Sequence, residues 1–154
     1  MKLSYFDVIS MVFHNYEYIT SENDIVSFLG QDNLKDVTTD EDQDPDFPIP
    51  HYTKVFNFEA REAYLGILDV SFSLSNRLLN ARILLHFGDN SNIDTAKMFY
   101  EKTLLPYIKK ELSINESAPN PMITGHTFWQ KNLEVTARWV TNMPSVATYL
   151  TLID

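Results

Sequence analysis

Carboxylates are the most concentrated chemical groups in this sequence. The stretch DVTTDEDQDPDFPIPHY, residues 36–52, holds six acids in its first eleven residues and contains neither Lys nor Arg. The acids that alternate from Asp40 to Asp44 have the spacing of oxygen ligands in a calcium loop. Such a loop also needs Gly at its sixth position and a bidentate Glu at its twelfth, where this chain has Pro45 and His51. The pattern excludes an EF-hand, and we expect no dedicated metal site.

The histidines and the remaining carboxylates form no catalytic motif. The histidines lack the H-x-H or HExxH spacing of metal-binding pairs. Paired carboxylates can carry out glycoside or proton-transfer chemistry, but nothing in the sequence brings two of these acids together. The chain has no Cys, no glycine-rich phosphate loop and no G-x-S-x-G motif. We therefore expect no catalytic residue and no cofactor. The groups considered are His14, His51, His86, His126, Glu59, Glu62, Asp69 and Glu134.

The length and composition predict one α+β domain that spans residues 1–154. Apolar residues make up 44% of the chain and aromatic residues 13%, which is enough to build a core. The absence of Cys fits a reducing compartment, and Asp7, which interrupts the apolar N-terminal stretch, argues against a signal peptide. No apolar run is long enough to cross a bilayer. We expect a cytoplasmic protein.

The net charge of −9 indicates which kinds of molecule the chain is suited to bind. Binding to nucleic acids or anionic membranes depends on Lys and Arg, which are few and scattered here. A field of one sign speeds the encounter with a partner of opposite sign and disfavours other partners. We therefore expect a basic protein partner, and neither nucleic acid nor a membrane as a direct one.

Two helices are predicted to open the chain. Between Ser4 and Ile19 the apolar residues follow helical spacing. A second, short helix is expected after Thr20 or Ser21, either of which can cap it, and Gly30 is expected to end it. The acidic stretch that follows, with its three prolines, is predicted to be an extended surface loop.

A sheet and one further helix are predicted for the next part of the chain. Alternation with a period of two residues indicates strands near 52–62, 66–74 and 79–87. Residues 94–112 follow helical spacing, and a kink is expected at Pro106 because its ring clashes with the preceding turn.

The C-terminal third is predicted to contain a loop and two strands. NESAPNPMITG, residues 115–125, is typical of a loop, and FWQKNLEVTARWV, residues 128–140, alternates as one strand. A last strand follows at 145–153. The predicted order is therefore ααβββαββ, with one mostly antiparallel sheet of about five strands and helices covering one face. The residues expected on one face of the tryptophan-containing strand are Trp129, Leu133, Val135, Ala137 and Trp139.

The acidic segment is the candidate binding site. Prolines lower the entropy lost when a loop is immobilised, which favours pre-organised binding. Acids beside apolar anchors suit a basic protein, because the acids steer the encounter and the anchors supply desolvated contact. The alternative is a solvated connection whose charge only improves solubility. The residues expected to contact the partner are Asp40, Glu41, Asp42, Asp44, Asp46, Phe47, Ile49 and Tyr52.

In its layout and in the stretch TTDEDQDPDFPIPHY, the chain resembles the small acidic immunity proteins of bacterial toxin–immunity systems. These include the immunity proteins of contact-dependent growth inhibition and of polymorphic nuclease toxins. The resemblance implies a cytoplasmic, non-catalytic inhibitor that binds one toxin domain tightly, often over a basic active site. It assigns no role to individual residues.

Two other functions remain open at the level of the sequence. Helices packed on a curved sheet can enclose a pocket, as in NTF2-like folds, and Tyr64, Trp129 and Trp139 could line one for a small ligand or substrate. The chain could instead be a structural or assembly subunit that self-associates through an exposed edge strand at Ser145–Ile153. The sequence leaves the oligomeric state open.

Overall fold

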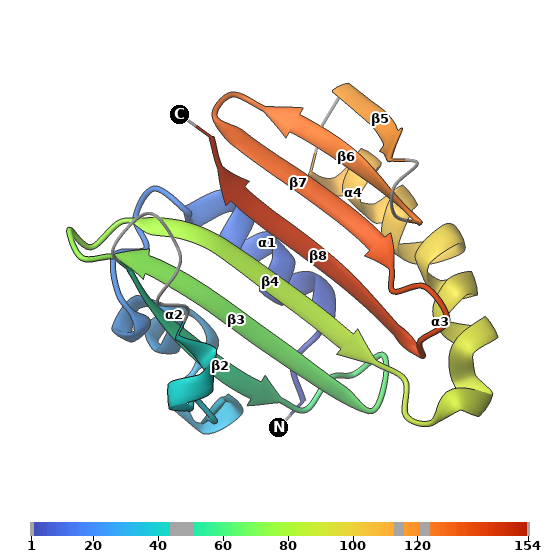
Figure 1. Ribbon diagram of the computed structural model, residues 1–154, viewed down its shortest axis with the longest axis horizontal. Helices are drawn as coiled ribbons and strands as arrows, with labels where there is room; N and C mark the ends of the chain where they lie inside the picture. Colours follow the sequence, from blue (N-terminus) through green and yellow to red (C-terminus); the bar gives the residue numbers. More distant parts are fainter. Residues whose placement is uncertain (1, 44–50, 113–115, 121–123, 154) are drawn as a thin grey trace.

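The computed structural model describes residues 2–43, 51–112, 116–120 and 124–153. Within these ranges one sheet contains eight strands in the order β1-β2-β3-β4-β8-β7-β6-β5, and every neighbouring pair is antiparallel. Figure 1 shows the sheet from one side, with helix α1 behind it. The strands are β1 (Lys35–Asp36), β2 (His51–Phe58), β3 (Leu65–Ser73), β4 (Leu78–His86), β5 (Glu116–Asn120), β6 (Gly125–Gln130), β7 (Leu133–Trp139) and β8 (Ser145–Leu152).

Helix α1 (Tyr5–Asn15) crosses the middle of the sheet and contacts β4 and β8. Ser4 caps it, because its Oγ accepts a hydrogen bond from the amide of Phe6 at 3.3 Å. The carboxylate of Glu62, from the β2–β3 connection, accepts hydrogen bonds from Ser4 Oγ and from the amide of Tyr5, both at 2.7 Å. A negative charge at a helix N-terminus is favourable, so this contact ties the start of α1 to the sheet.

Helix α2 (Glu22–Leu29) confirms the predicted short second helix. Ser21 is its N-cap, and the carboxylate of Asp24 accepts hydrogen bonds from the amides of Thr20 and Ser21. Gly30 follows the last turn with a φ of 91°, a conformation that residues with a side chain rarely adopt. The 3₁₀ turn η1 (Gln31–Asn33) then leads to the edge of the sheet.

The helical run after β4 contains a π-helical turn. It begins after the 3₁₀ turn η3 (Asn90–Asn92) and consists of α3 (Ile93–Phe99), the π turn η4 (Tyr100–Leu104) and α4 (Leu105–Glu111). The π turn ends at Leu104, two residues before Pro106, which has no amide hydrogen and whose ring would clash with a carbonyl of an ordinary α turn. The sequence predicted a kink here, and the helix accommodates the proline through a widened turn.

One face of the sheet builds the core with the helices. Successive residues of a strand point to opposite faces, so residues directly opposite one another share a face. On the helix side Leu68, Ile83 and Thr148 are paired across β3, β4 and β8, and each is fully buried. The hydroxyl of Tyr5 donates to the carbonyl of Ile83 at 2.7 Å and lies 3.0 Å from Thr148 Oγ1, which joins α1 to the centre of the sheet.

The predicted strand number was wrong, because the sheet has eight strands instead of about five. The stretch predicted as one strand at 128–140 is a hairpin of β6 and β7. Lys131 occupies its turn with a φ of 54°, a left-handed conformation that reverses the chain without a Gly or Pro to signal it. The two-residue β1 and the strand β5, within the predicted loop, account for the other additional strands.

The hairpin also changes which residues share a face. Leu133, Val135, Ala137 and Trp139 are buried on the helix side, as predicted. Trp129 lies on the other face, opposite Glu134, and its side chain is 37% exposed. A prediction that continues the two-residue alternation through a turn assigns residues to the wrong face, because the turn shifts the alternation.

Strand β8 is an interior strand, which corrects the expectation of an exposed edge at Ser145–Ile153. It lies between β4 and β7 and pairs with both. Assembly through the free edge of this strand is therefore ruled out, because its backbone groups are already paired. None of the described helices combines the length and apolar character of a membrane-spanning segment.

Candidate functional site

The described part of the acidic segment is attached to the outer edge of β2. Asp40, Glu41 and Asp42 lie within it, in the 3₁₀ turn η2 (Asp40–Asp42). The predicted contact residues Asp44, Asp46, Phe47 and Ile49 lie outside the described residues. With Tyr52 in β2, the structure therefore places four of the eight predicted contact residues.

The attachment uses the backbone groups that β2 presents at its outer edge. The amide of Val37 donates to the carbonyl of Val55 at 2.9 Å, and the amide of Val55 donates to Thr38 Oγ1 at 2.9 Å. One step further along, Gln43 Nε2 donates to the carbonyl of Thr53 at 3.0 Å, and its Oε1 accepts from the amide of Thr53 at 2.8 Å. The Gln43 side chain thus takes the place of a neighbouring strand, and the segment covers an edge that would otherwise be open to pairing.

The acids of the segment divide into those held by local contacts and those facing solvent. Asp36 accepts hydrogen bonds from the side chain and the amide of Thr38, which hold the pKa of its carboxyl below the usual range, and it pairs with Lys54 at 3.5 Å. Asp42 accepts from the amide of Thr39 at 2.7 Å and closes the turn. Asp40 and Glu41 are exposed. The segment therefore presents negative charge from a built turn.

Tyr52 has a structural role in addition to the predicted one. It lies on the helix side of β2, half-buried, and its ring stacks on Phe72 with the ring centroids 5.3 Å apart. Burial raises the pKa of its phenol. A partner can reach only the outer part of this ring, and the contact predicted for Tyr52 stays a prediction.

We expect the substitution Gln43→Ala to loosen the acidic segment. Loss of the two hydrogen bonds to Thr53 should lower the free energy of unfolding by about 1 kcal/mol. The amide of Thr53 should exchange with solvent several-fold faster, measured by hydrogen–deuterium exchange, because its acceptor is removed. Gln31→Ala, at an exposed position, is the matched control. Unchanged exchange at Thr53 would show that the Gln43 contact does not hold the segment.

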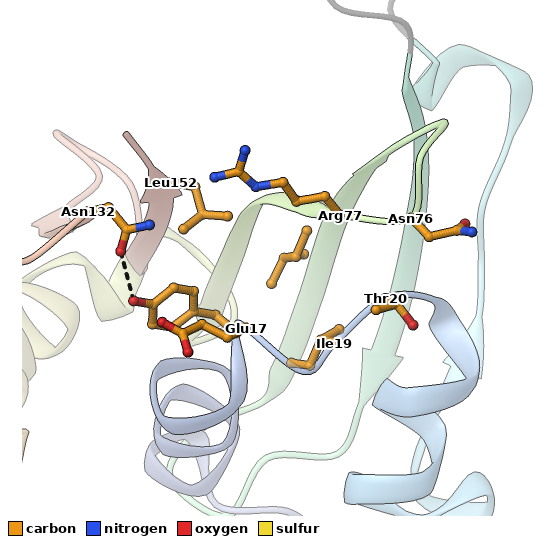
Figure 2. Close-up of a pocket in the computed structure, with 9 residues that line it drawn as sticks. Glu17, Ile19, Thr20, Asn76, Arg77, Asn132 and Leu152 are labelled. Carbon is orange, nitrogen blue, oxygen red and sulfur yellow. Dashed lines mark hydrogen bonds between the residues drawn. The ribbon is translucent and has the colours of Figure 1, made fainter. Parts of the chain in front are cut away.

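A pocket lies at one end of the molecule, where the C-terminal end of α1 meets the β3–β4 and β6–β7 turns (Figure 2). Its volume is about 200 Å³. The hydroxyl of Tyr16 donates to Asn132 Oδ1 at 2.9 Å and closes one side, and the Arg77 side chain extends across the pocket toward Leu152. Burial, followed by the nearby Glu17 carboxylate, raises the pKa of Tyr16. The pocket lies outside the predicted site. Its lining residues are Tyr16, Glu17, Ile19, Thr20, Asn76, Arg77, Leu78, Asn132 and Leu152.

The aromatic residues proposed to line a ligand cup do not converge. Tyr64 is exposed in the β2–β3 connection, Trp129 lies on the face opposite the helices, and Trp139 is buried on the helix side. The indole of Trp139 donates to the carbonyl of Met143 at 3.0 Å. These positions do not support the small-ligand alternative in the form that the sequence suggested.

The face of the sheet turned away from the helices carries a row of charged and polar side chains that the sequence alone does not bring together. Asp69, Arg82, Tyr149 and Thr136 are directly opposite one another across β3, β4, β8 and β7. Arg82 Nη2 lies 3.0 Å from Asp69 Oδ2. We call this side the open face. The strand alternation already separated Asp69 from the core, but only the register shows which residues lie beside it.

The negative charge of the acidic segment acts on Asp69 of the open face. Desolvation raises the pKa of Asp69, the charge of Arg82 opposes this rise, and the negative charge of Asp42 adds to it. The turn η2 contacts β2, and Val55 of β2 is directly opposite Asp69, so the acidic segment borders the open face.

No protein-family model, no curated protein and no solved structure matches this chain. In the described part of the chain, no three His, Asp or Glu side chains are grouped as metal ligands would be.

Proposed function

We propose that the chain is a non-catalytic immunity-type protein that binds and neutralises a basic toxin domain. The observation that carries the proposal is the attachment of the acidic segment to β2, with Asp40 and Glu41 exposed on the η2 turn. Fixed acids lose little conformational freedom on binding, and a chain of net charge −9 attracts a basic partner over long range. Localisation in the cytoplasm, where such a toxin acts, belongs to the same proposal.

The proposal predicts that the gene immediately upstream encodes a large protein that ends in a basic C-terminal domain, and this domain is the partner to be used in the test. Co-expression of the full chain should restore growth of cells that produce this domain. In stopped-flow mixing at low salt, the pair Asp40→Lys and Glu41→Lys should slow association by about tenfold, because steering by opposite charge is reversed. The wild-type association rate should also fall as salt is added.

A matched control separates local from global charge. The pair Glu101→Lys and Glu111→Lys changes the net charge by the same amount at exposed positions of η4 and α4. We expect this pair to slow association far less. The proposal fails if the neighbouring domain neither harms cells nor binds, or if both pairs of substitutions have the same effect.

A further inference from the structure

The open face is a continuous surface of mixed apolar and cationic character. Next to the row that contains Asp69 and Arg82, a second row crosses the sheet directly: Ile67 in β3, Leu84 in β4, Ala147 in β8, Arg138 in β7 and Gly125 in β6. Figure 1 is a view onto this side of the sheet. Since neighbouring strands are about 4.8 Å apart, Leu84 and Arg138 are separated by about 10 Å, which one element of a partner can span.

Arg138 is the unsatisfied charge of this surface. Among the described residues its side chain forms no ion pair and no hydrogen bond, and its Nε is buried without an acceptor. The residues directly opposite it are Gly125 and Ala147, so no long side chain stands beside it in its row. Arg82 also has a buried Nε without an acceptor, but its Nη2 already pairs with Asp69. A half-buried guanidinium without an anion favours a ligand that brings one.

The other residues of the face match the composition of protein interfaces. Trp, Tyr and Arg are enriched among residues that dominate binding energy, and the open face presents Trp129, Tyr149, Arg82 and Arg138. Ile67 and Leu84 add half-buried apolar contact next to them. The bordering acids of η2 would repel a phosphate or a nucleic acid, so the anion that suits Arg138 is a carboxylate on an otherwise basic protein.

We propose that the partner protein docks on the open face, places an Asp or Glu carboxylate against Arg138 and covers Ile67 and Leu84 with apolar side chains. This inference rests on the proposed function, since it takes the same basic domain as the occupant. The acids of η2 then accelerate the encounter, and the open face determines how long the complex persists.

The test is a calorimetric titration of the full chain with the basic domain that the proposed function predicts in the upstream gene product. Arg138→Gln should weaken binding by about tenfold, the loss of one charge-assisted pair, mainly through faster dissociation. Leu84→Asp should weaken it at least as much. Lys110→Gln, an exposed position on α4 with the same change of charge, is the control and should bind as the wild type does. Circular dichroism melting should show that Arg138→Gln is as stable as the wild type, because no internal partner is lost.

The outcomes separate this inference from the proposed function. If the Asp40 and Glu41 reversal slows association while Arg138→Gln and Leu84→Asp bind normally, the docking face is wrong and the proposed function stands. If the neighbouring domain does not bind the wild type, both are overturned. A titration with sodium acetate tests whether Arg138 binds a free carboxylate instead. If the chemical shifts of Arg138 change with acetate until they saturate, and Arg138→Gln still binds the domain normally, then the ligand of Arg138 is a small carboxylate and not the partner protein.

Discussion

The substitution Gly66→Ala is expected to lower the free energy of unfolding by about 3 kcal/mol, the upper part of the range for overpacked cores. Gly66 lies in β3 directly opposite Phe58 of β2, and the ring of Phe58 covers it. A Cβ at residue 66 would stand 2.2 Å from two ring atoms of Phe58, far inside any van der Waals contact. Both strands are hydrogen-bonded on either side, so the backbone cannot move away. Urea titration followed by circular dichroism measures the effect.

A double-mutant cycle identifies the cause of this loss. Phe58→Leu alone removes ring atoms from the core and should cost stability by itself. In the double variant Gly66→Ala with Phe58→Leu the added methyl meets a smaller side chain, so the combined loss should be less than the sum of the single losses. If the two losses simply add, the ring is not the group that excludes a Cβ at residue 66.

The helices and the first strands were predictable because each has a local signal. Ser21 begins α2 as its N-cap, and Gly30 ends the helix in a left-handed conformation. Each preference is a property of the single residue. The alternation in β3 and β4 also survives, because the face packed on helices needs apolar residues at every second position.

The C-terminal strands were not predictable in the same way. Lys131 turns the chain in a left-handed conformation that Lys rarely adopts, and the alternating residues before and after it read as one strand. β1 is two residues long and exists because it pairs with β2, so no local pattern announces it. Strand pairing between distant segments decides such elements, and one sequence contains little information on it.

The candidate surface was also predictable only in part. The acidic segment was visible as composition, but its attachment to β2 depends on Gln43, a residue with no distinguishing signal in the sequence. Arg82 and Arg138 lie far apart in the chain and share a face only through the order β4-β8-β7. The charged residues can therefore be identified from the sequence, whereas the pairing register of the strands is needed to know which of them share a surface.

The substitution Tyr5→Phe is expected to lower the free energy of unfolding by about 2 kcal/mol, since it removes only the hydroxyl group and leaves buried polar atoms without a partner. Tyr5 is fully buried, and its hydroxyl donates to the carbonyl of Ile83 and accepts from Thr148 Oγ1. Thr148 is also fully buried, so water cannot replace the lost contact. Tyr100→Phe is the control, because no hydrogen-bond partner of the Tyr100 hydroxyl is found among the described residues, and it should change stability little.

Two further measurements make the Tyr5 prediction specific. Adding Thr148→Val to Tyr5→Phe removes the hydroxyl that Tyr5→Phe leaves without its partner, so the double variant should regain part of the loss. Burial also raises the pKa of Tyr5 well above its ordinary value of 10.0, so the folded state keeps a proton that the unfolded state releases above that pH. The contribution of Tyr5 is therefore complete below pH 10 and declines above it, and the stability difference between wild type and Tyr5→Phe should narrow in alkaline solution. A difference that stayed constant through this range would show that Tyr5 ionises equally in both states.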